Sequence, residues 1–156
     1  MKLKTSKKLM SFLLFLFLMG FSFVSAQSNE LLDELLSQDS AQLGITTYLI
    51  LTASGHVSSN DSPSLAMEKA KELNLIKTTD LEEDVVRADR LSFMLMKSLE
   101  IPGGVMYKLF PRPRFAYKHL VYLGYMSDSA GPARIVAGDE VVRVLGYLLE
   151  LKGGKL

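Results

Sequence analysis

The sequence predicts an all-α fold in which tandem helical hairpins stack into one domain. Residues 66–76 and 116–126 share one pattern, a short helix that ends in Leu, then Asn or Gly, then two apolar residues. Apolar triplets at residues 48–50, 93–95 and 144–146 also repeat, at spacings of 45 and 51 residues. Helical units of this size cannot bury their apolar faces alone, so we expect them to share a core.

The first 26 residues are predicted to be a cleavable secretory signal peptide. Four lysines precede the apolar run of residues 9–24, and Val24-Ser25-Ala26 supplies the small residues that signal peptidase requires. A permanent membrane anchor is the alternative, but the run is shorter than the roughly 20 residues that span a bilayer. We therefore expect export to the periplasm or the cell envelope, with no membrane span after cleavage.

Composition argues against several classes of protein. The chain contains no cysteine, so it has no disulfide framework and no lipid-modified cysteine. The whole chain has 18 basic and 17 acidic residues, and cleavage removes four lysines, which leaves 14 − 17 = −3. This charge argues against nucleic-acid binding, which usually requires a concentrated basic face. About 130 residues remain after cleavage, which suits one domain.

Residues 27–63 are predicted to be N-terminal helices that form a degenerate first repeat, or cap. Ser28 or Asn29 can cap a helix that runs to residue 37 and carries an edge of leucines. Residues 43–53 are mostly apolar and predict a buried helix, which Ser54-Gly55 ends.

Residues 64–151 are predicted to hold the helical repeats. Pro63 suits the first turn of a helix that ends near residue 73, and a charged, turn-rich segment follows at residues 77–84. A second helix is expected at residues 90–99, where apolar residues recur at helical spacing on one face. These residues are Leu91, Met94, Leu95 and Leu99.

The rest of the chain is predicted to contain one extended segment and two helices. Pro111 and Pro113 favour an extended loop over residues 107–114, and a helix is expected at residues 115–123. A turn at residues 128–132 leads to the last helix, which begins at residue 139 or 140 and ends at 151. Residues 152–156 form a tail.

Two segments carry a family resemblance. Residues 86–91, Val-Arg-Ala-Asp-Arg-Leu, resemble the Thr-Arg-Ala-Glu signature of the bacterial S-layer homology (SLH) domain, and residues 115–126 resemble its lead helix. The resemblance implies a pseudo-symmetric helical domain that binds pyruvylated secondary cell-wall polymer in grooves between repeats. It also implies that Arg87 and Phe115 occupy the binding positions of such a groove. The third copy has Ala137-Gly138-Asp139-Glu140 at the place of the signature.

Arg87 and Asp89 form the first candidate binding site. The guanidinium can bind a carboxylate or ketal acid in a two-pronged arrangement. The alternative, which the sequence favours, is structural: Asp89 complements the helix N-terminus and Arg87 braces the neighbouring unit.

The second candidate site is the segment around Pro111. Arg112 and Arg114 lie among the aromatic residues Tyr107, Phe110 and Phe115, and Lys108 and Lys118 flank them. Guanidinium and aromatic groups together suit a sugar, an acidic polymer or a partner protein. A solvated connector is the equal alternative.

No pattern in the chain predicts catalysis. His56 and His119 are isolated, so we expect no metal and no cofactor. The sequence singles out no pair of carboxylates and no nucleophile elbow. We therefore predict an exported, non-enzymatic, envelope-associated interaction or structural protein that docks on an envelope protein. Binding of cell-wall polymer is the alternative, and a small cell-wall hydrolase is a remote one.

Overall fold

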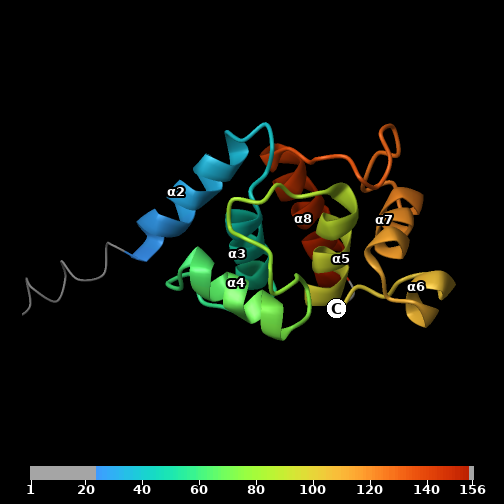
Figure 1. Ribbon diagram of the computed structural model, residues 1–156, viewed down its shortest axis with the longest axis horizontal. Helices are drawn as coiled ribbons and strands as arrows, with labels where there is room; N and C mark the ends of the chain where they lie inside the picture. Colours follow the sequence, from blue (N-terminus) through green and yellow to red (C-terminus); the bar gives the residue numbers. More distant parts are fainter. Residues whose placement is uncertain (1–23, 155–156) are drawn as a thin grey trace, which may run out of the picture.

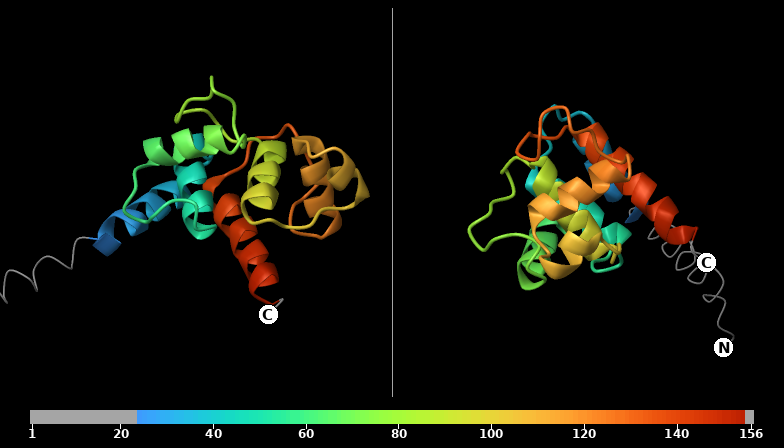
Figure 2. Two further views of the ribbon diagram at one scale, coloured as in Figure 1. Left: turned by 90° about the horizontal axis from the view of Figure 1, so that it is seen from below. Right: turned by 90° about the vertical axis from the view of Figure 1, so that its right-hand side faces the viewer.

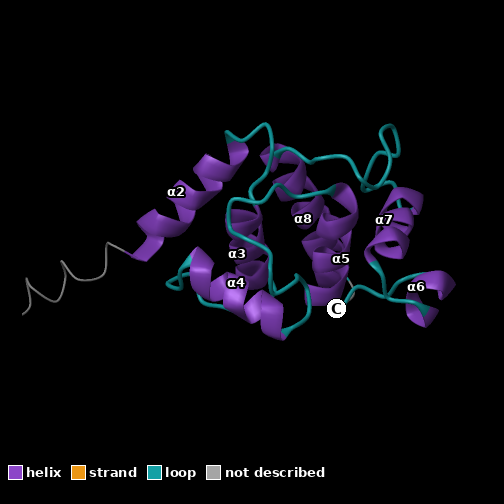
Figure 3. Cartoon of the chain, viewed as in Figure 1, coloured by secondary structure: helices purple, strands orange, loops and turns teal. Residues whose placement is uncertain are grey.

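The computed structural model describes residues 24–154 and confirms the all-α class (Figure 3). Within this part the chain forms seven helices and no strand. Most of the predicted signal peptide, residues 1–23, lies outside the described residues. The helices are α2 (Val24–Leu36), α3 (Leu43–Ala53), α4 (Pro63–Glu72), α5 (Ala88–Ser98), α6 (Val105–Leu109), α7 (Pro113–Tyr122) and α8 (Gly138–Gly153).

The helices pair differently from the hairpins that the sequence predicts. The two repeats of the sequence begin with α4 and α7, which were expected to pack on the helices that follow them, α5 and α8. Instead α4 packs on α3, and α7 packs on α5 (Figures 1 and 2). The connections at residues 73–87 and 123–137 are long enough to lead the chain away from the helix that it has just left. Helical periodicity locates a helix, but it does not determine which neighbour the helix contacts.

Three backbone positions form a closed ring of hydrogen bonds at the centre of the fold. The N–H of Ala41 donates to the carbonyl of Val136 at 2.8 Å, that of Val136 to Val86 at 3.0 Å, and that of Val86 to Ala41 at 2.9 Å. Each residue is fully buried and lies two positions before α3, α5 or α8. We call α3 with α4 the first unit, α5 with α6 and α7 the second, and α8 the third, each with the residues that lead into it. The three units therefore meet around one centre, and the first contacts the third.

A second set of hydrogen bonds links the same three segments in the opposite direction. The N–H groups of Leu43, Ala88 and Gly138 donate to the carbonyls of Asp84, Arg134 and Gln38, at 2.8 to 2.9 Å. The residue before each of these helices has extended backbone. The ring therefore fixes where each central helix begins.

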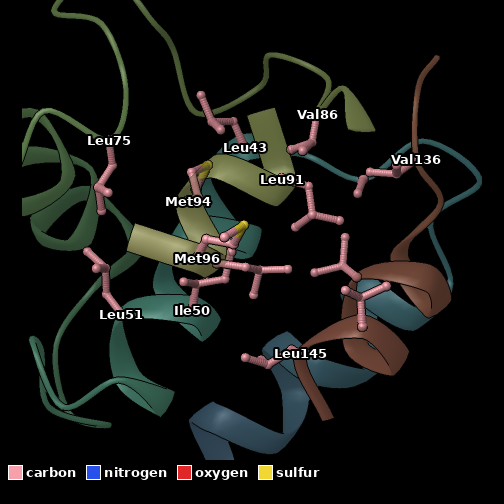
Figure 4. Packing of buried hydrophobic residues seen from close by; sticks show 14 of the residues in the cluster. Leu43, Ile50, Leu51, Leu75, Val86, Leu91, Met94, Met96, Val136 and Leu145 are labelled. Atoms are coloured by element: carbon pink, nitrogen blue, oxygen red, sulfur yellow. The ribbon is translucent and has the colours of Figure 1, made fainter. Parts of the chain in front are cut away.

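One hydrophobic core fills the space between the helices (Figure 4). The predicted face of α5 is confirmed, because its four apolar residues are buried and contribute to this core. Burial of such a side chain stabilises a fold by roughly 1.5–3 kcal/mol. The four residues are Leu91, Met94, Leu95 and Leu99.

Four helices end in the same left-handed turn. In α3, α4, α5 and α7 an N–H two residues after the C-cap donates to a carbonyl in the last turn of the helix, at 2.9 to 3.0 Å. This is the Schellman motif, which needs one residue with positive φ. In these four turns the residues with positive φ are Gly55, Asn74, Glu100 and Gly124.

The predicted extended loop at residues 107–114 is wrong in most of its length. Residues 105–109 form the short helix α6, and Arg114 already belongs to α7. Gly104 has extended backbone and starts α6, whereas Pro113 occupies the first turn of α7, where a missing N–H has no cost. Only the Phe110–Arg112 connection is non-helical.

Candidate functional site

A basic groove of about 590 Å³ lies between the end of α4, the start of α5 and Pro113. Arg87 and Asp89, the first candidate pair, both line it. Three other basic residues line this groove, and no sequence pattern predicts them because they belong to different elements and come together only in the fold. They are Lys71, Lys77 and Arg90.

Arg87 is held by Asp89 but remains half exposed. Its Nη2 lies 2.9 Å from Oδ2 of Asp89, and 52 % of the Arg87 side chain is accessible, against 17 % for Asp89. Oδ1 of Asp89 accepts a hydrogen bond from the backbone N–H of Arg90 at 2.9 Å, in the first turn of α5. The carboxylate therefore fixes the guanidinium at the groove, and the remaining N–H groups of Arg87 can reach an anion there.

Arg90, rather than Arg87, braces the neighbouring segment. Its Nη2 lies 2.9 Å from Oδ1 of Asp80, a carboxylate whose side chain is only 9 % exposed. Oδ2 of Asp80 accepts a hydrogen bond from the backbone N–H of Lys77 at 2.6 Å. Arg90 therefore makes a side-chain brace of the kind that the sequence predicts for Arg87, whose own side chain bonds Asp89. Arg87 meets the next unit through its backbone, in an isolated bridge to Ile135.

The equivalent groove one unit earlier has the opposite charge. It measures about 230 Å³ and includes Gln42 and Pro63. Gln42 is the N-cap of α3 as Arg87 is that of α5, and Pro63 begins α4 as Pro113 begins α7. Its charged lining residues are all glutamates: Glu34, Glu82 and Glu83. A ligand that needs a basic groove would therefore bind at the second unit and not at the first.

In the third unit an internal ion pair occupies the corresponding region. Arg134 donates from both terminal nitrogens to the carboxylate of Glu140, with Nη1 at 2.6 Å from Oε2, and both side chains are largely buried. This carboxylate raises the pKa of Arg134 above its ordinary value. The Tyr117 hydroxyl lies nearby and donates to the carbonyl of Ser127 at 3.0 Å. These contacts join α7 to the segment before α8.

The second candidate site forms an exposed apolar and basic surface at the other side of Pro113. We define the α6–α7 surface as the accessible residues of α6, of the Phe110–Arg112 connection and of the outer side of α7. The aromatic rings of Phe110 and Phe115 contact one another there, with centroids 6.4 Å apart. The surface comprises Val105, Met106, Tyr107, Lys108, Leu109, Phe110, Arg112, Arg114, Phe115, Lys118 and Tyr122.

The apolar part of this surface is unusually accessible. No residue of α6 is buried, and Val105 is 73 % and Leu109 65 % exposed. A groove of about 430 Å³ separates α6 from α7 and contacts Tyr107, Phe115 and Tyr122, of which Tyr122 is 86 % exposed. Burial raises the pKa of Tyr107, the half-buried residue that joins α6 to the fold.

All charged residues of the α6–α7 surface are basic. Lys108, Arg112, Arg114 and Lys118 are all exposed, and residues 101–127 contain no Asp or Glu. None of the five ion pairs among residues 24–154 includes these four residues. Arg114 also lines a small cavity of about 130 Å³ next to Asp128.

The predicted site residues therefore divide into two adjoining sites. Arg87 and Asp89 lie in the basic groove, whereas the five residues predicted from Tyr107 to Phe115 lie on the α6–α7 surface. Pro113 connects them, because it lines the groove and begins α7.

The described residues, 24–154, contain neither a metal-binding cluster nor a membrane-spanning helix. No cluster of three or more His, Asp or Glu residues is placed to hold a metal ion in this part of the chain. None of its helices combines the length and apolar character needed to cross a bilayer.

Comparisons with known proteins gave no match. No protein-family model matches the chain. No curated protein and no solved structure matches it either.

Proposed function

We propose that the chain is an exported, non-enzymatic interaction protein that docks on a component of the cell envelope through the α6–α7 surface. The observation that carries this proposal is the exposure of α6, a helix with no buried residue that presents Val105 and Leu109 next to unpaired basic side chains. Folded proteins rarely expose contiguous apolar residues without an interaction that covers them.

Sedimentation with isolated envelopes tests this proposal. The mature protein, which we expect to begin at Gln27, should co-sediment with envelope fractions. Replacement of Arg112 and Arg114 by alanine should abolish most of this binding and leave the thermal midpoint unchanged, because exposed charges contribute little to stability. Undiminished sedimentation of the double variant would refute the proposed docking surface.

Binding of an acidic cell-wall polymer through the basic groove is the second candidate. It is favoured by Arg87, which Asp89 orients beside Lys71 and Lys77 in a groove that also includes Phe93. A guanidinium in this position can bind a carboxylate of the polymer by charge-assisted hydrogen bonds.

Sacculi with and without their secondary polymer distinguish the two candidates. Polymer-dependent binding that is lost in Arg87→Ala at unchanged stability would support the groove. Binding that is the same on stripped sacculi would exclude it.

The proposed compartment has a separate test. The intact mass of the exported protein should correspond to a chain that begins at Gln27. A mass that still includes residues 1–26 would contradict export by a cleavable signal.

A further inference from the structure

We propose that the α6–α7 surface binds the anionic face of a phospholipid bilayer. In this arrangement α6 and Phe110 enter the interfacial layer, and the four basic side chains contact lipid phosphates. The inference rests on the proposed function, since it takes the α6–α7 surface as the docking surface and names the component on which it docks.

Apart from Tyr107, which packs against the core, the apolar side chains of α6 lie outside it. The helix lies at the end of the molecule opposite α2, beside α7 (Figure 1). Val105, Met106, Leu109 and Phe110 are each at least half exposed. Transfer of these side chains from water into the apolar boundary of a bilayer is favourable in proportion to the area that leaves water.

The form of α6 suits a bilayer better than a partner helix. Its five residues make about 1.4 turns, so the wall that it offers to a bound helix is short. Exposed apolar residues stand at its start, Val105 and Met106, and at its end, Leu109. Tyr122 extends the apolar area across the groove. Tyrosine and phenylalanine are favoured at the boundary between lipid and water.

The charge of the surface fits phosphate groups. Lys108 lies within α6, Arg112 and Arg114 flank the start of α7, and Lys118 follows one turn later. Their long aliphatic stems can lie along apolar surface while the charged ends reach phosphate. An apolar insertion and a basic cluster are together sufficient for peripheral binding, whereas either one alone is weak.

Vesicle sedimentation of the mature protein tests the inference directly. We expect binding to vesicles of phosphatidylcholine mixed with phosphatidylglycerol, and little binding to phosphatidylcholine alone. Removal of the two arginines by Arg112→Ala with Arg114→Ala should weaken binding about tenfold or more at low salt, and less at high salt, where charges are screened.

A second variant separates apolar insertion from charge. Leu109→Ser with Phe110→Ser should reduce vesicle binding at every salt concentration, and circular dichroism should show an unchanged helix content because both residues are exposed. The matched controls lie outside the α6–α7 surface. They are Leu81→Ser, at a leucine that is 62 % exposed, and Arg143→Ala with Lys152→Ala on α8, and neither should alter binding.

The results separate this inference from the proposed function. Binding to isolated envelopes that depends on Arg112 and Arg114, without binding to lipid vesicles, would overturn the inference and leave the proposed function standing with a protein partner. Equal binding to both kinds of vesicle would overturn the role of charge. Binding to neither envelopes nor vesicles would overturn both proposals.

Discussion

Two arginines at the N-terminus of α5, the N-cap Arg87 and Arg90 in the first turn, have different structural roles. Arg90 contacts Asp80, a carboxylate with little access to water, whereas Arg87 contacts Asp89 at the edge of an open groove. A buried charge that loses its partner is costly, whereas an exposed pair contributes little. The same residue type is therefore structural at one position and available to a ligand three residues earlier.

Substitution of each arginine measures this difference. Arg90→Ala should lower the free energy of unfolding by about 1–3 kcal/mol, because Asp80 keeps its hydrogen bond from Lys77 but loses its counter-charge. Arg87→Ala should change it by less than about 0.5 kcal/mol. Urea denaturation of both variants provides the comparison, and equal losses would contradict the assignment of the brace to Arg90.

Glu100 occupies a backbone position that glycine tolerates better. Its φ is 57°, in the left-handed region, and its carboxylate lies at the C-terminal end of α5, where negative charge is unfavourable. Glu100→Gly should therefore raise the free energy of unfolding by about 0.5–1 kcal/mol.

Two further variants serve as controls for this prediction. Glu68→Gly, at an exposed position inside α4, should lower stability by about 1 kcal/mol. Glu100→Gln removes the charge but keeps the strain, so it should recover only part of the gain. A Glu100→Gly variant that is less stable than the natural protein would mean that the turn does not strain residue 100.

At the scale of single elements, the sequence predicts well where the helices lie and predicts poorly which helices pack together. The face of α5 and the cap of α4 follow from local rules, since Leu91 and Met94 recur at helical spacing and the Ser62 hydroxyl accepts from the Leu65 N–H at 3.2 Å. By contrast, α6 was missed because the two prolines after it suggested a longer extended segment. Arg90 was missed because its partner is ten residues away, in a loop whose path depends on the whole fold.

Two of the three glycines of α8, Gly138 and Gly146, make a prediction at the scale of this helix. Gly138 is buried against α2, and an added Cβ would overlap the carbonyl oxygen of Leu35, whereas a Cβ at Gly146 would meet nothing within 4 Å. Gly138→Ala should therefore destabilise the protein by at least about 1–3 kcal/mol. Gly146→Ala should stabilise it by about 1 kcal/mol, because alanine is the better helix former.

Thermal or urea denaturation of the two variants checks this contrast. They involve the same chemical change in one helix, so they are controls for each other. Changes of the same sign would contradict the close approach of α8 to α2.

At the scale of the whole molecule, the hydrogen-bonded ring determines how the units depend on one another. Each unit donates one bond to the ring and accepts one, so no unit is terminal. The sequence predicted a stack because the repeats follow one another along the chain. The contact between Ala41 and Val136, which are 95 positions apart, has no local signal and could not be predicted from spacing.

Removal of the third unit should therefore prevent folding of the other two. A chain of residues 27–127 loses Val136, which leaves the N–H of Ala41 and the carbonyl of Val86 without partners, at about 1–3 kcal/mol for each buried group. It also exposes the core that α8 covers. We expect no cooperative thermal transition for this fragment, measured by circular dichroism.

A chain that ends at residue 151 is the control for this prediction. It keeps the ring, and the residues that it loses are exposed over the described positions 152–154, so it should melt cooperatively, close to the full chain. Cooperative melting of the 27–127 fragment would show that the ring does not couple the units.

The ring also fixes the number of units in the domain. In an open solenoid, duplication of one repeat lengthens the protein and leaves the existing contacts intact. Here the three bonds of the ring measure 2.8 to 3.0 Å, so a fourth unit could enter only if one of them opened. Gene duplication of a single unit would therefore produce a misfolded chain, and this architecture can grow only by duplication of the entire domain.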